Sequence, residues 1–408
     1  MTEEAKRVIV VGGGASGLMA AGVAAGRGRQ VTVYERNQKV GRKLRIAGKG
    51  RCNLTNDTDV DGLLEHIPGN PKFLRTAFYS FGPQDTIAFF KDLGLPTKTE
   101  RGGRVFPISD NAEDVVHALL KFCRNAGVHF HTDKTVKRVM SSGGRVSGVL
   151  TEEDEPIMCD AVILATGGAS YPGTGSKGDG YRMAGEFGHT IVPIRPSLVP
   201  LETEETWPAE AQGLALRNVT LTTLSPQGKK VHSELGEMLF THFGVSGPLV
   251  LTASRHAEPG GKLVIDLKPG LTEELLDARI LRDFEKYHRR EFGNALVDLL
   301  PTSLIPVIIR LSRIGLGTYV HNVTREQRQG LARLLKNLTL TVKALRPFTE
   351  AVTTVGGVNV KEIDPRTLES KLIPGLFFTG EVIDVDGYTG GYNLQIAWST
   401  GHLAGESV

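Results

Sequence analysis

The sequence predicts an α/β protein whose first and last segments form one domain, with a β-rich segment and a helical segment inserted between them. Short apolar runs that end in glycine-rich turns occur at the start of the chain, near residue 165 and again near residue 380. Such runs are typical of buried parallel strands that end at one edge of a sheet. Between residues 195 and 345 the pattern changes, first to that of β-strands and then to that of helices. The expected domains are therefore 1–194 with 346–408, 195–270 and 271–345.

The composition is that of a globular protein. The chain has 408 residues, which is long enough for two or three domains, and 40% of them are hydrophobic and 23% charged. Its 49 glycines fall in clusters. Clustered glycine indicates places where the backbone closes on a ligand.

Charge and cysteine usage exclude several classes. The net charge of +3 is spread along the chain, and no long Lys/Arg run is interleaved with aromatic residues, so no nucleic-acid partner is expected. Cys52, Cys123 and Cys159 are too few and too irregularly spaced for a disulfide framework or a zinc site. The chain starts without a signal-peptide pattern and has no apolar run of about 18 residues. We therefore expect a cytoplasmic protein without a metal or a membrane span, and the oligomeric state is not indicated.

The N-terminus carries a dinucleotide-binding fingerprint. The apolar run Arg7–Val11 is followed by Gly12, Gly14 and Gly17 in the order G-x-G-x-x-G, and then by a helix-like stretch of small residues. In this motif the first glycine allows the turn, the second lets the backbone approach a pyrophosphate, and the third lets helix and strand pack closely. A second apolar run ends at Glu35, whose carboxylate can bind ribose hydroxyls and disfavours a 2′-phosphate. A Rossmann-type domain is predicted, but this motif alone leaves the dinucleotide open.

The far end of the chain indicates FAD. The strand-like run Leu376–Thr379 precedes Gly380-Glu381, a glycine-rich loop and a small-residue helix that opens near Asn393. FAD enzymes hold the ribityl chain and the flavin with such segments. The first N–H groups of that helix would face flavin N1/C2=O, where negative charge accumulates on reduction. A third strand ends in glycines at Ala161–Gly168, after a probable β-meander over residues 136–159. The formal second fingerprint at Gly173–Gly178 is discounted, because prolines break the following run HTIVPI.

Several long motifs resemble one family. They include VVGGGASG from Val10, GRKLRIAGKGRCNLTN over residues 41–56, ATGGASYPGTGSKGDGY from Ala165, GEMLFTHFGVSGP from Gly236 and GEVIDVDGYTGGYNLQ from Gly380. In these motifs the chain resembles the BaiN-like, aminoacetone-oxidase-like flavoproteins, which are NAD(P)/FAD-dependent oxidoreductases. The resemblance implies a discontinuous FAD domain interrupted by a β-rich and a helical domain, with the flavin at their junction. It also implies either an amine oxidase that uses oxygen or a reductase fed by NAD(P)H.

The predicted cofactor residues lie in the motifs of the two chain ends, in the third glycine-ended strand with the start of the meander before it, and in the basic, glycine-rich loop over residues 41–56, which has the character of an anion-holding loop. They are Gly12, Gly14, Ala15, Ser16, Gly17, Glu35, Arg36, Lys43, Gly50, Arg51, Cys52, Asn53, Val136, Ala165, Thr166, Gly167, Gly380, Glu381, Asp386, Gly391, Tyr392, Asn393, Leu394 and Gln395. Asp384 and Asp386 are interpreted as turn or ribityl residues rather than a metal site. Asp110 and Glu113 have the spacing of a capping box at a helix start.

The predicted activity is that of an FAD-dependent oxidoreductase that acts on a small organic substrate by hydride transfer at flavin N5. NAD(P)H is expected only as a transient visitor at the open flavin face, because one convincing dinucleotide motif exists and FAD takes it. Candidate catalytic residues are His242, Tyr171 and Arg104; His242 leads because its pKa suits proton transfer near neutrality. A redox-neutral hydratase or isomerase with structural FAD stays open as an alternative.

Overall fold

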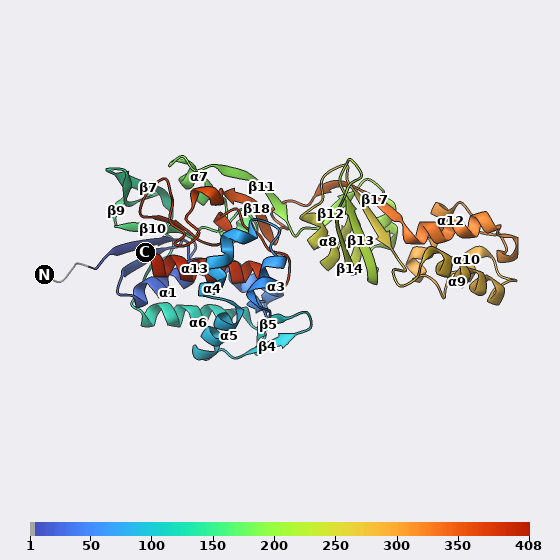
Figure 1. Ribbon diagram of the computed structural model, residues 1–408, viewed down its shortest axis with the longest axis horizontal. Coiled ribbons are helices and arrows are strands. Elements are labelled where there is room, and N and C mark those ends of the chain that lie inside the picture. The colour runs from blue at the N-terminus through green and yellow to red at the C-terminus, as the bar shows by residue number, and fades with distance from the viewer. Residues whose placement is uncertain (1–4) are drawn as a thin grey trace. The chain divides into compact units, whose positions relative to one another are not determined.

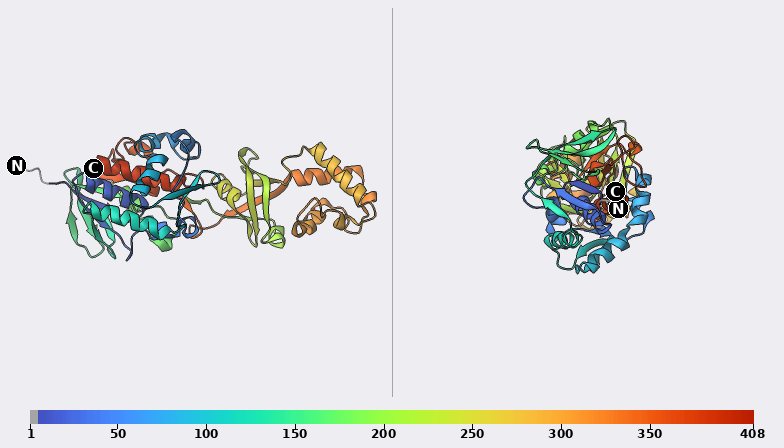
Figure 2. Two further views of the ribbon diagram at one scale, coloured as in Figure 1. Left: turned by 90° about the horizontal axis from the view of Figure 1, so that it is seen from below. Right: turned by 90° about the vertical axis from the view of Figure 1, so that its left-hand side faces the viewer.

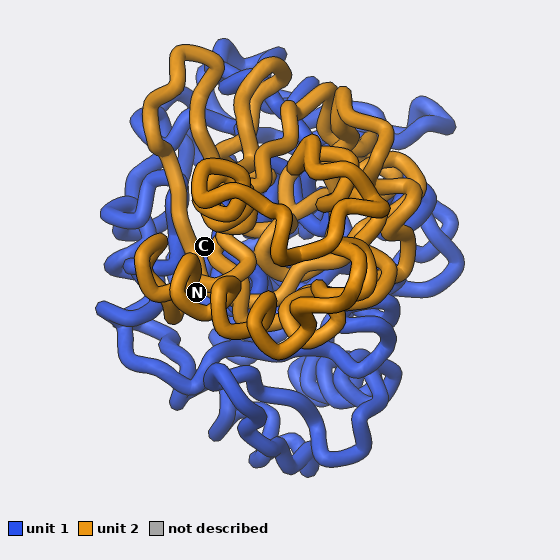
Figure 3. Tube along the Cα trace, turned by 90° about the vertical axis from the view of Figure 1, so that its right-hand side faces the viewer, with its two compact units in different colours: residues 1–196, 351–408 blue, residues 197–350 orange. Residues whose placement is uncertain are grey.

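The structure is a computed structural model that describes residues 5–408, and it divides into two compact units (Figure 3). Unit 1 contains the chain up to residue 196 together with residues 351–408, and unit 2 contains residues 197–350. The segments expected as a β-rich and a helical domain both lie in unit 2, and their separation into two domains stays a prediction. Each unit is described by itself below.

Unit 1 is built on a five-stranded parallel sheet in the order β19-β10-β1-β2-β6. The strands are β1 (Arg7–Val11), β2 (Gln30–Tyr34), β6 (His129–His131), β10 (Ala161–Leu164) and β19 (Leu376–Phe378). All residues of β10 and β19 are buried, as expected for parallel strands covered on both faces. The first and last segments of the chain therefore share one sheet, which confirms the predicted Rossmann-type fold.

Two helices from opposite ends of the chain pack against each other beside this sheet. They are α1 (Ala15–Gly26) and α13 (Tyr392–Ser407), the blue and red helices that lie side by side in Figures 1 and 2. The approach is close because α13 presents glycines: a Cβ at Gly401 would overlap Ser16 O, and one at Gly405 would come within 2.7 Å of Ala20 O. Arg29 Nε also donates to the Val408 carbonyl at 2.9 Å. The first and last helices of the chain are thus held together.

The remaining elements of unit 1 surround the sheet. Their bounds are α2 (Arg42–Ile46), β3 (Thr55–Asn56), α3 (Val60–Glu65), α4 (Arg75–Ser80), α5 (Pro83–Asp92), β4 (Thr97–Glu100), β5 (Arg104–Pro107), α6 (Ala112–Asn125), β7 (Val136–Ser142), β8 (Arg145–Thr151), β9 (Pro156–Met158), α7 (Asp179–Gly185), β11 (Ile191–Ser197) and β18 (Thr353–Val358). Strands β7, β8 and β9 form the expected meander, β3, β5 and β4 form a second small sheet, and β11 pairs with β18.

Two local expectations are wrong. The run HTIVPI does not break at its prolines: Pro193 and Pro196 lie inside β11, which an edge position in a two-stranded sheet allows. The predicted capping box is also absent, because Asn111 caps α6 by accepting a hydrogen bond from Glu113 N at 3.1 Å. The Asp110 carboxylate instead binds Arg51 and Lys98.

Unit 2 is a closed barrel that carries helices. The barrel order is β12-β15-β14-β13-β16-β17, with β12 (Leu201–Thr203), β13 (Ala215–Leu224), β14 (Lys230–Thr241), β15 (Gly244–Ser246), β16 (Lys262–Asp266) and β17 (Leu338–Leu345). The helices are α8 (Pro248–Ser254), α9 (Glu273–Lys286), α10 (Phe292–Ala295), α11 (Ile305–Ser312) and α12 (Arg325–Lys336). Leu276, Ile280 and Phe284 are buried, which confirms the predicted apolar stripe of α9. Barrel and helices share one hydrophobic core.

Candidate cofactor site

The fingerprint loop after β1 is closed against the protein at two glycines and open at the third. Gly12 has φ +106°, and a Cβ there would come within 2.5 Å of Ala165 O. A Cβ at Gly17 would overlap Gly12 O, whereas a Cβ at Gly14 would meet nothing within 4 Å. Gly14 is also the N-cap of α1 and has no side chain to satisfy the first N–H groups. The loop therefore leaves space and free N–H donors at the start of α1, where a pyrophosphate binds in this motif.

Glu35 ends β2 beside this loop and is only 8% exposed. Its Oε2 accepts a hydrogen bond from Gly13 N at 2.9 Å, and its Oε1 accepts from Asn37 N at 2.8 Å and Asn37 Nδ2 at 2.6 Å. These donors orient the carboxylate, and Oε2, which accepts one hydrogen bond, keeps a lone pair for a ribose hydroxyl. Asn37 was not predicted as a site residue, because nothing in its local pattern separates it from an ordinary turn asparagine.

A polar cluster connects four separate segments of unit 1. Lys43 Nζ donates to Glu381 Oε2 at 2.6 Å and to Ser170 Oγ at 2.5 Å. Ser170 Oγ and Thr354 N donate to the other oxygen of Glu381, at 2.5 and 2.8 Å. Two of these residues, Lys43 and Glu381, were predicted site residues, and the structure brings them together from positions 338 residues apart.

The charge state of this cluster follows from its surroundings. Burial alone would raise the pKa of the Glu381 carboxyl, but the Lys43 ammonium and the hydrogen bonds from Ser170 and Thr354 lower that pKa below its usual value. The side chains of Lys43 and Glu381 are 28% and 20% exposed. The Glu381 carboxyl is therefore ionised at neutral pH, and its contacts fix the loops that follow β10 and β19.

The start of α13 is held by a close backbone contact. Gly391 has φ +103°, and a Cβ there would overlap the Thr55 carbonyl. The Tyr392 ring stacks on His66 with ring centroids 4.6 Å apart. Asn393 closes the preceding loop: its Oδ1 accepts from Gly387 N at 2.9 Å and its Nδ2 donates to Gly387 O at 2.7 Å. The first N–H groups of α13 have no partner inside the helix, as at any helix start.

The loop over residues 47–53 has an uncommon backbone. Lys49 and Cys52 both have φ +60°, a left-handed conformation that residues other than glycine adopt rarely. The side-chain oxygen of Asn53 is buried and has no hydrogen-bond partner within residues 5–408. A strained loop next to an unpaired polar atom is typical of a segment shaped for a ligand.

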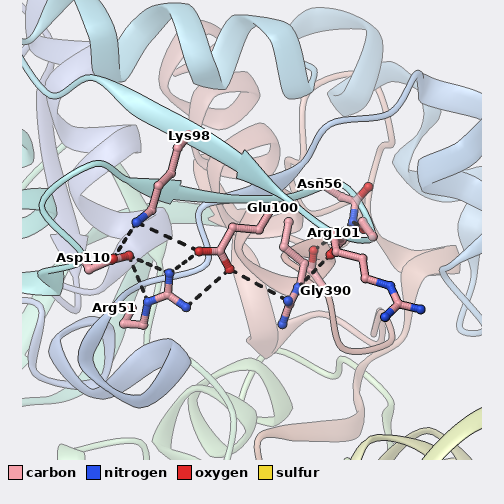
Figure 4. Close-up of polar contacts among 9 residues, drawn as sticks. Arg51, Asn56, Lys98, Glu100, Arg101, Asp110 and Gly390 are labelled. Carbon is pink, nitrogen blue, oxygen red and sulfur yellow. Dashed lines mark hydrogen bonds and ion pairs between the residues drawn. The ribbon is translucent and has the colours of Figure 1, made fainter.

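Three predicted cofactor residues have side chains engaged elsewhere. Arg51 binds Glu100 and Asp110 at 2.5 and 2.6 Å and lies over the Phe106 ring, in the network of Figure 4. The Cys52 thiol is fully buried, and burial raises its pKa. The Gln395 amide is fully buried.

Gln395 makes four hydrogen bonds inside the protein. Its oxygen accepts from Thr55 Oγ1 at 2.6 Å and Thr86 Oγ1 at 2.9 Å. Its nitrogen donates to Phe81 O at 3.0 Å and Ser399 Oγ at 2.9 Å. The side chains of Gln395, Arg51 and Cys52 are thus engaged within the protein, and only their backbone atoms could contact a cofactor. That these three residues bind FAD stays a prediction.

The other predicted cofactor residues line the same region of unit 1. Gly380 has φ +70°, and a Cβ there would come within 2.6 Å of Ser16 Oγ, so Gly380 and Ser16 touch. Arg36 pairs with Asp179 at 2.9 Å. The remaining predicted cofactor residues are buried or partly buried; they are Ala15, Gly50, Val136, Ala165, Thr166, Gly167, Asp386 and Leu394.

The three candidate catalytic residues come from separate segments, and their role stays a prediction. His242 is exposed and lies in unit 2, directly after β14. Tyr171 lies in unit 1, in the loop after β10, with φ +50°. Arg104 is exposed and donates from Nε to Arg101 O at 3.1 Å, with Glu100 at 3.8 Å.

The residues present fit FAD. The cradle at Gly14, the oriented Glu35 carboxylate, the unpaired Asn53 oxygen and the open helix start at α13 supply anion, ribose and flavin contacts from both chain ends. Fold and site together define a flavoprotein, an FAD-dependent oxidoreductase. The chain belongs to the family described as the HI0933-like protein Rossmann domain, whose family model matches residues 6–407.

Relatives match the chain over almost its whole length. It is 35% identical to a 3-dehydro-bile acid delta(4,6)-reductase of Clostridium scindens and 32% identical to a ribosomal RNA dihydrouridine synthase of Haemophilus influenzae, in both cases over 98% of each chain. A solved 3-ketosteroid delta1-dehydrogenase from Sterolibacterium denitrificans shares the fold, with a TM-score of 0.53, 13% identity and 99% of each chain covered.

Residues 5–408 contain neither a helix that could span a membrane nor a cluster of metal-binding side chains. Each helix there is too short or too polar to cross a bilayer. Within the same residues, His, Cys, Asp and Glu side chains do not gather in groups of three or more that could hold a metal ion.

Proposed function

We propose that the chain is an FAD-dependent reductase that delivers a hydride from flavin N5 to an activated carbon–carbon double bond, with NAD(P)H as the source of electrons. The observation that carries this proposal is the convergence of both chain ends on one sheet edge, with an open phosphate cradle at Gly14 and an open helix start at α13. Ligands of open α/β sheets bind at the carboxyl ends of the strands, where these groups lie.

Residues of unit 1 would hold the cofactor. The backbone at Gly14 and the start of α1 would bind the pyrophosphate, Glu35 the adenosine ribose, and the first N–H groups of α13 the flavin carbonyl edge. When bound, FAD supplies a carrier that accepts and passes on a hydride. The Lys43–Glu381 pair would keep the loops after β10 and β19 in place during the reaction.

A proton must accompany the hydride, and Tyr171 is the candidate donor that lies in the same unit as these residues. Its loop follows β10 directly, and its neighbour Ser170 is fixed by Glu381. A positioned proton donor contributes about 10² to 10⁴ in rate. Tyr171→Phe should therefore slow substrate reduction by about that factor and leave flavin reduction by NAD(P)H unchanged. His242→Asn is the matched variant in unit 2; equal loss in that variant alone would transfer the role to His242.

The names of the relatives support reduction of a double bond rather than oxidation of an amine. One is a reductase of a bile acid and the other forms dihydrouridine, the reduced form of uridine. The sequence predicts a small organic substrate, and the bile acid in the name of the first relative is a molecule of that kind. The expected absence of a nucleic-acid partner is not confirmed, since the second relative acts on ribosomal RNA.

Anaerobic stopped-flow spectroscopy of the holoenzyme tests the proposal. NADH or NADPH should bleach the flavin absorbance, and an enone such as a 3-keto-4-ene steroid should restore it without oxygen. Bleaching that only oxygen reverses, with an amine as the better reductant, would favour an amine oxidase. Turnover that is independent of flavin oxidation state would favour a hydratase or isomerase and overturn the proposal.

A further inference from the structure

Unit 2 carries a surface of basic and aromatic side chains that the reaction at the flavin does not use. It consists of residues 286–290, with the sequence KYHRR at the end of α9, and residues 319–321, with the sequence YVH. Backbone pairing joins the two segments: Val320 N donates to Arg290 O at 3.1 Å, and Phe292 N donates to Thr318 O at 2.7 Å. His321 Nδ1 lies 2.7 Å from His288 O. We call these eight residues the basic aromatic surface.

Two of its cations, Arg289 and Arg290, are free to bind an anion. Arg289 and Arg290 are exposed, and neither has an acidic partner within residues 5–408. Lys286, in contrast, is paired with Asp298 at 2.6 Å. The Arg290 guanidinium lies 4.6 Å from the centre of the Tyr287 ring. An arginine held against a ring keeps its N–H groups directed outward for a phosphate, because the stacking restricts its side chain.

Its aromatic groups are exposed in a way that favours stacking. The Tyr319 side chain is 46% exposed, and its ring stacks on His321 with centroids 5.6 Å apart and planes at 26°. Leu316, in the preceding loop, is 64% exposed. Exposed rings beside unpaired arginines are the combination with which proteins bind single-stranded nucleic acid without reading its sequence.

We propose that the basic aromatic surface binds single-stranded RNA, with phosphates on Arg289 and Arg290 and a base on Tyr319. The inference rests on the proposed function, because uracil carries a double bond conjugated to a carbonyl, the kind of bond that the proposed reaction reduces. The sequence alone does not reveal the surface, since its two halves lie about 30 residues apart and only the backbone pairing joins them.

Fluorescence anisotropy of the holoenzyme with a 5′-labelled 20-nucleotide oligouridine RNA tests this. The double variant Arg289→Ala/Arg290→Ala should weaken binding about tenfold at low salt and make the salt dependence shallower by about 1.4 in the log–log slope, the value for two single-strand phosphate contacts. Tyr319→Ala should weaken binding about tenfold through lost stacking. The matched control is Lys229→Ala/Lys230→Ala, in the exposed turn between β13 and β14, which should bind as the wild type does.

Three outcomes would overturn the inference: no RNA binding by the wild type, equal loss in the Lys229/Lys230 control, or binding that polyphosphate displaces fully and Tyr319→Ala leaves unchanged. The last result would indicate a polyanion surface without base contacts. Flavin reduction by NADPH is measured on the same preparations. Normal flavin reduction without RNA binding would refute only this inference, whereas absent flavin reduction with intact RNA binding would refute only the proposed function.

Discussion

Replacing Gly14 by alanine should separate cofactor binding from folding. At Gly14 the backbone has φ −84° and ψ −169°, which alanine adopts freely, and the added methyl would meet no protein atom within 4 Å. Alanine restricts the unfolded chain, which stabilises by about 0.4–1 kcal/mol, but it is a poorer N-cap than glycine. The two effects oppose each other, so the unfolding free energy of the apoprotein should change by less than about 1 kcal/mol.

The same methyl would occupy the space into which a pyrophosphate fits. An extra methyl in a fitted contact costs about 1–3 kcal/mol, which corresponds to a roughly 5- to 150-fold increase in the Kd for FAD. Fluorescence quenching of FAD on titration with apoprotein measures that Kd, and urea unfolding of the apoprotein measures stability.

Two other glycines of the same segment are the controls. Gly26→Ala, at the end of α1, also meets nothing within 4 Å and should leave FAD binding unchanged. Gly17→Ala would overlap Gly12 O and should destabilise the apoprotein by about 3 kcal/mol or more. Wild-type FAD affinity in Gly14→Ala would refute the placement of the pyrophosphate, and an unfolded Gly14→Ala would refute the reading of that space as open.

Further predictions concern groups whose environment the structure defines. The lowered pKa of Glu381 means that its ionisation stabilises the fold above about pH 4.3, the unfolded value, and that this contribution is lost as pH falls through the lower folded value. In Lys43→Met the ammonium is gone, so burial raises the pKa of Glu381. The free energy of unfolding in urea should then fall below that of the wild type by an amount that grows from pH 5 to pH 8 and reaches about 2 kcal/mol, since the pair is partly exposed. A difference that does not depend on pH would contradict the ionised Glu381. Gln395→Leu removes the acceptor that Thr55 and Thr86 share, although Thr86 Oγ1 can still donate to Gly82 O at 3.1 Å. The change should cost about 1–3 kcal/mol by the same measurement, and a loss below about 0.5 kcal/mol would show that the network is not formed. Burial raises the pKa of Cys123 to about 12 and also raises that of Cys52, so a thiol reagent at pH 8 should modify neither in the native protein and both in urea; rapid native labelling would contradict their burial.

Local pattern was sufficient wherever a motif acts through its own backbone. The strand before Gly12, the helix after it, Glu35 at the end of β2 and the start of α13 within one residue of Asn393 all follow from short-range spacing and glycine placement. These features depend on residues a few positions apart, so a single sequence contains the information. The Rossmann-type fold and its FAD were predictable for that reason.

Side-chain roles that depend on distant partners were not predictable in the same way. Arg51 was expected at the cofactor, but its contacts are Glu100 and Asp110, 49 and 59 residues away. The charge pattern of the basic loop indicates an anion equally well whether that anion is a phosphate or a carboxylate of the protein itself. Thr354 was not predicted as a site residue, because its backbone N–H donates to Glu381 only in the folded arrangement of β18 and β19.

The packing of α1 against α13 also sets an order of events during synthesis. Unit 2 is a continuous stretch, residues 197–350, so it can fold as it emerges, whereas unit 1 lacks β19 and α13 until the ribosome has made residues 376–408. At about 5–20 residues per second, the 212 residues from 197 to 408 take roughly 10–40 seconds to translate. For that interval the small-residue face of α1 has no partner and the sheet has an unpaired edge at β10. Such an unpaired edge is open to wrong strand pairing until the end of the chain is made. Loss of the last two turns of α13 would remove the contacts of Gly401 and Gly405 with α1 and would leave the residues of unit 2 unchanged.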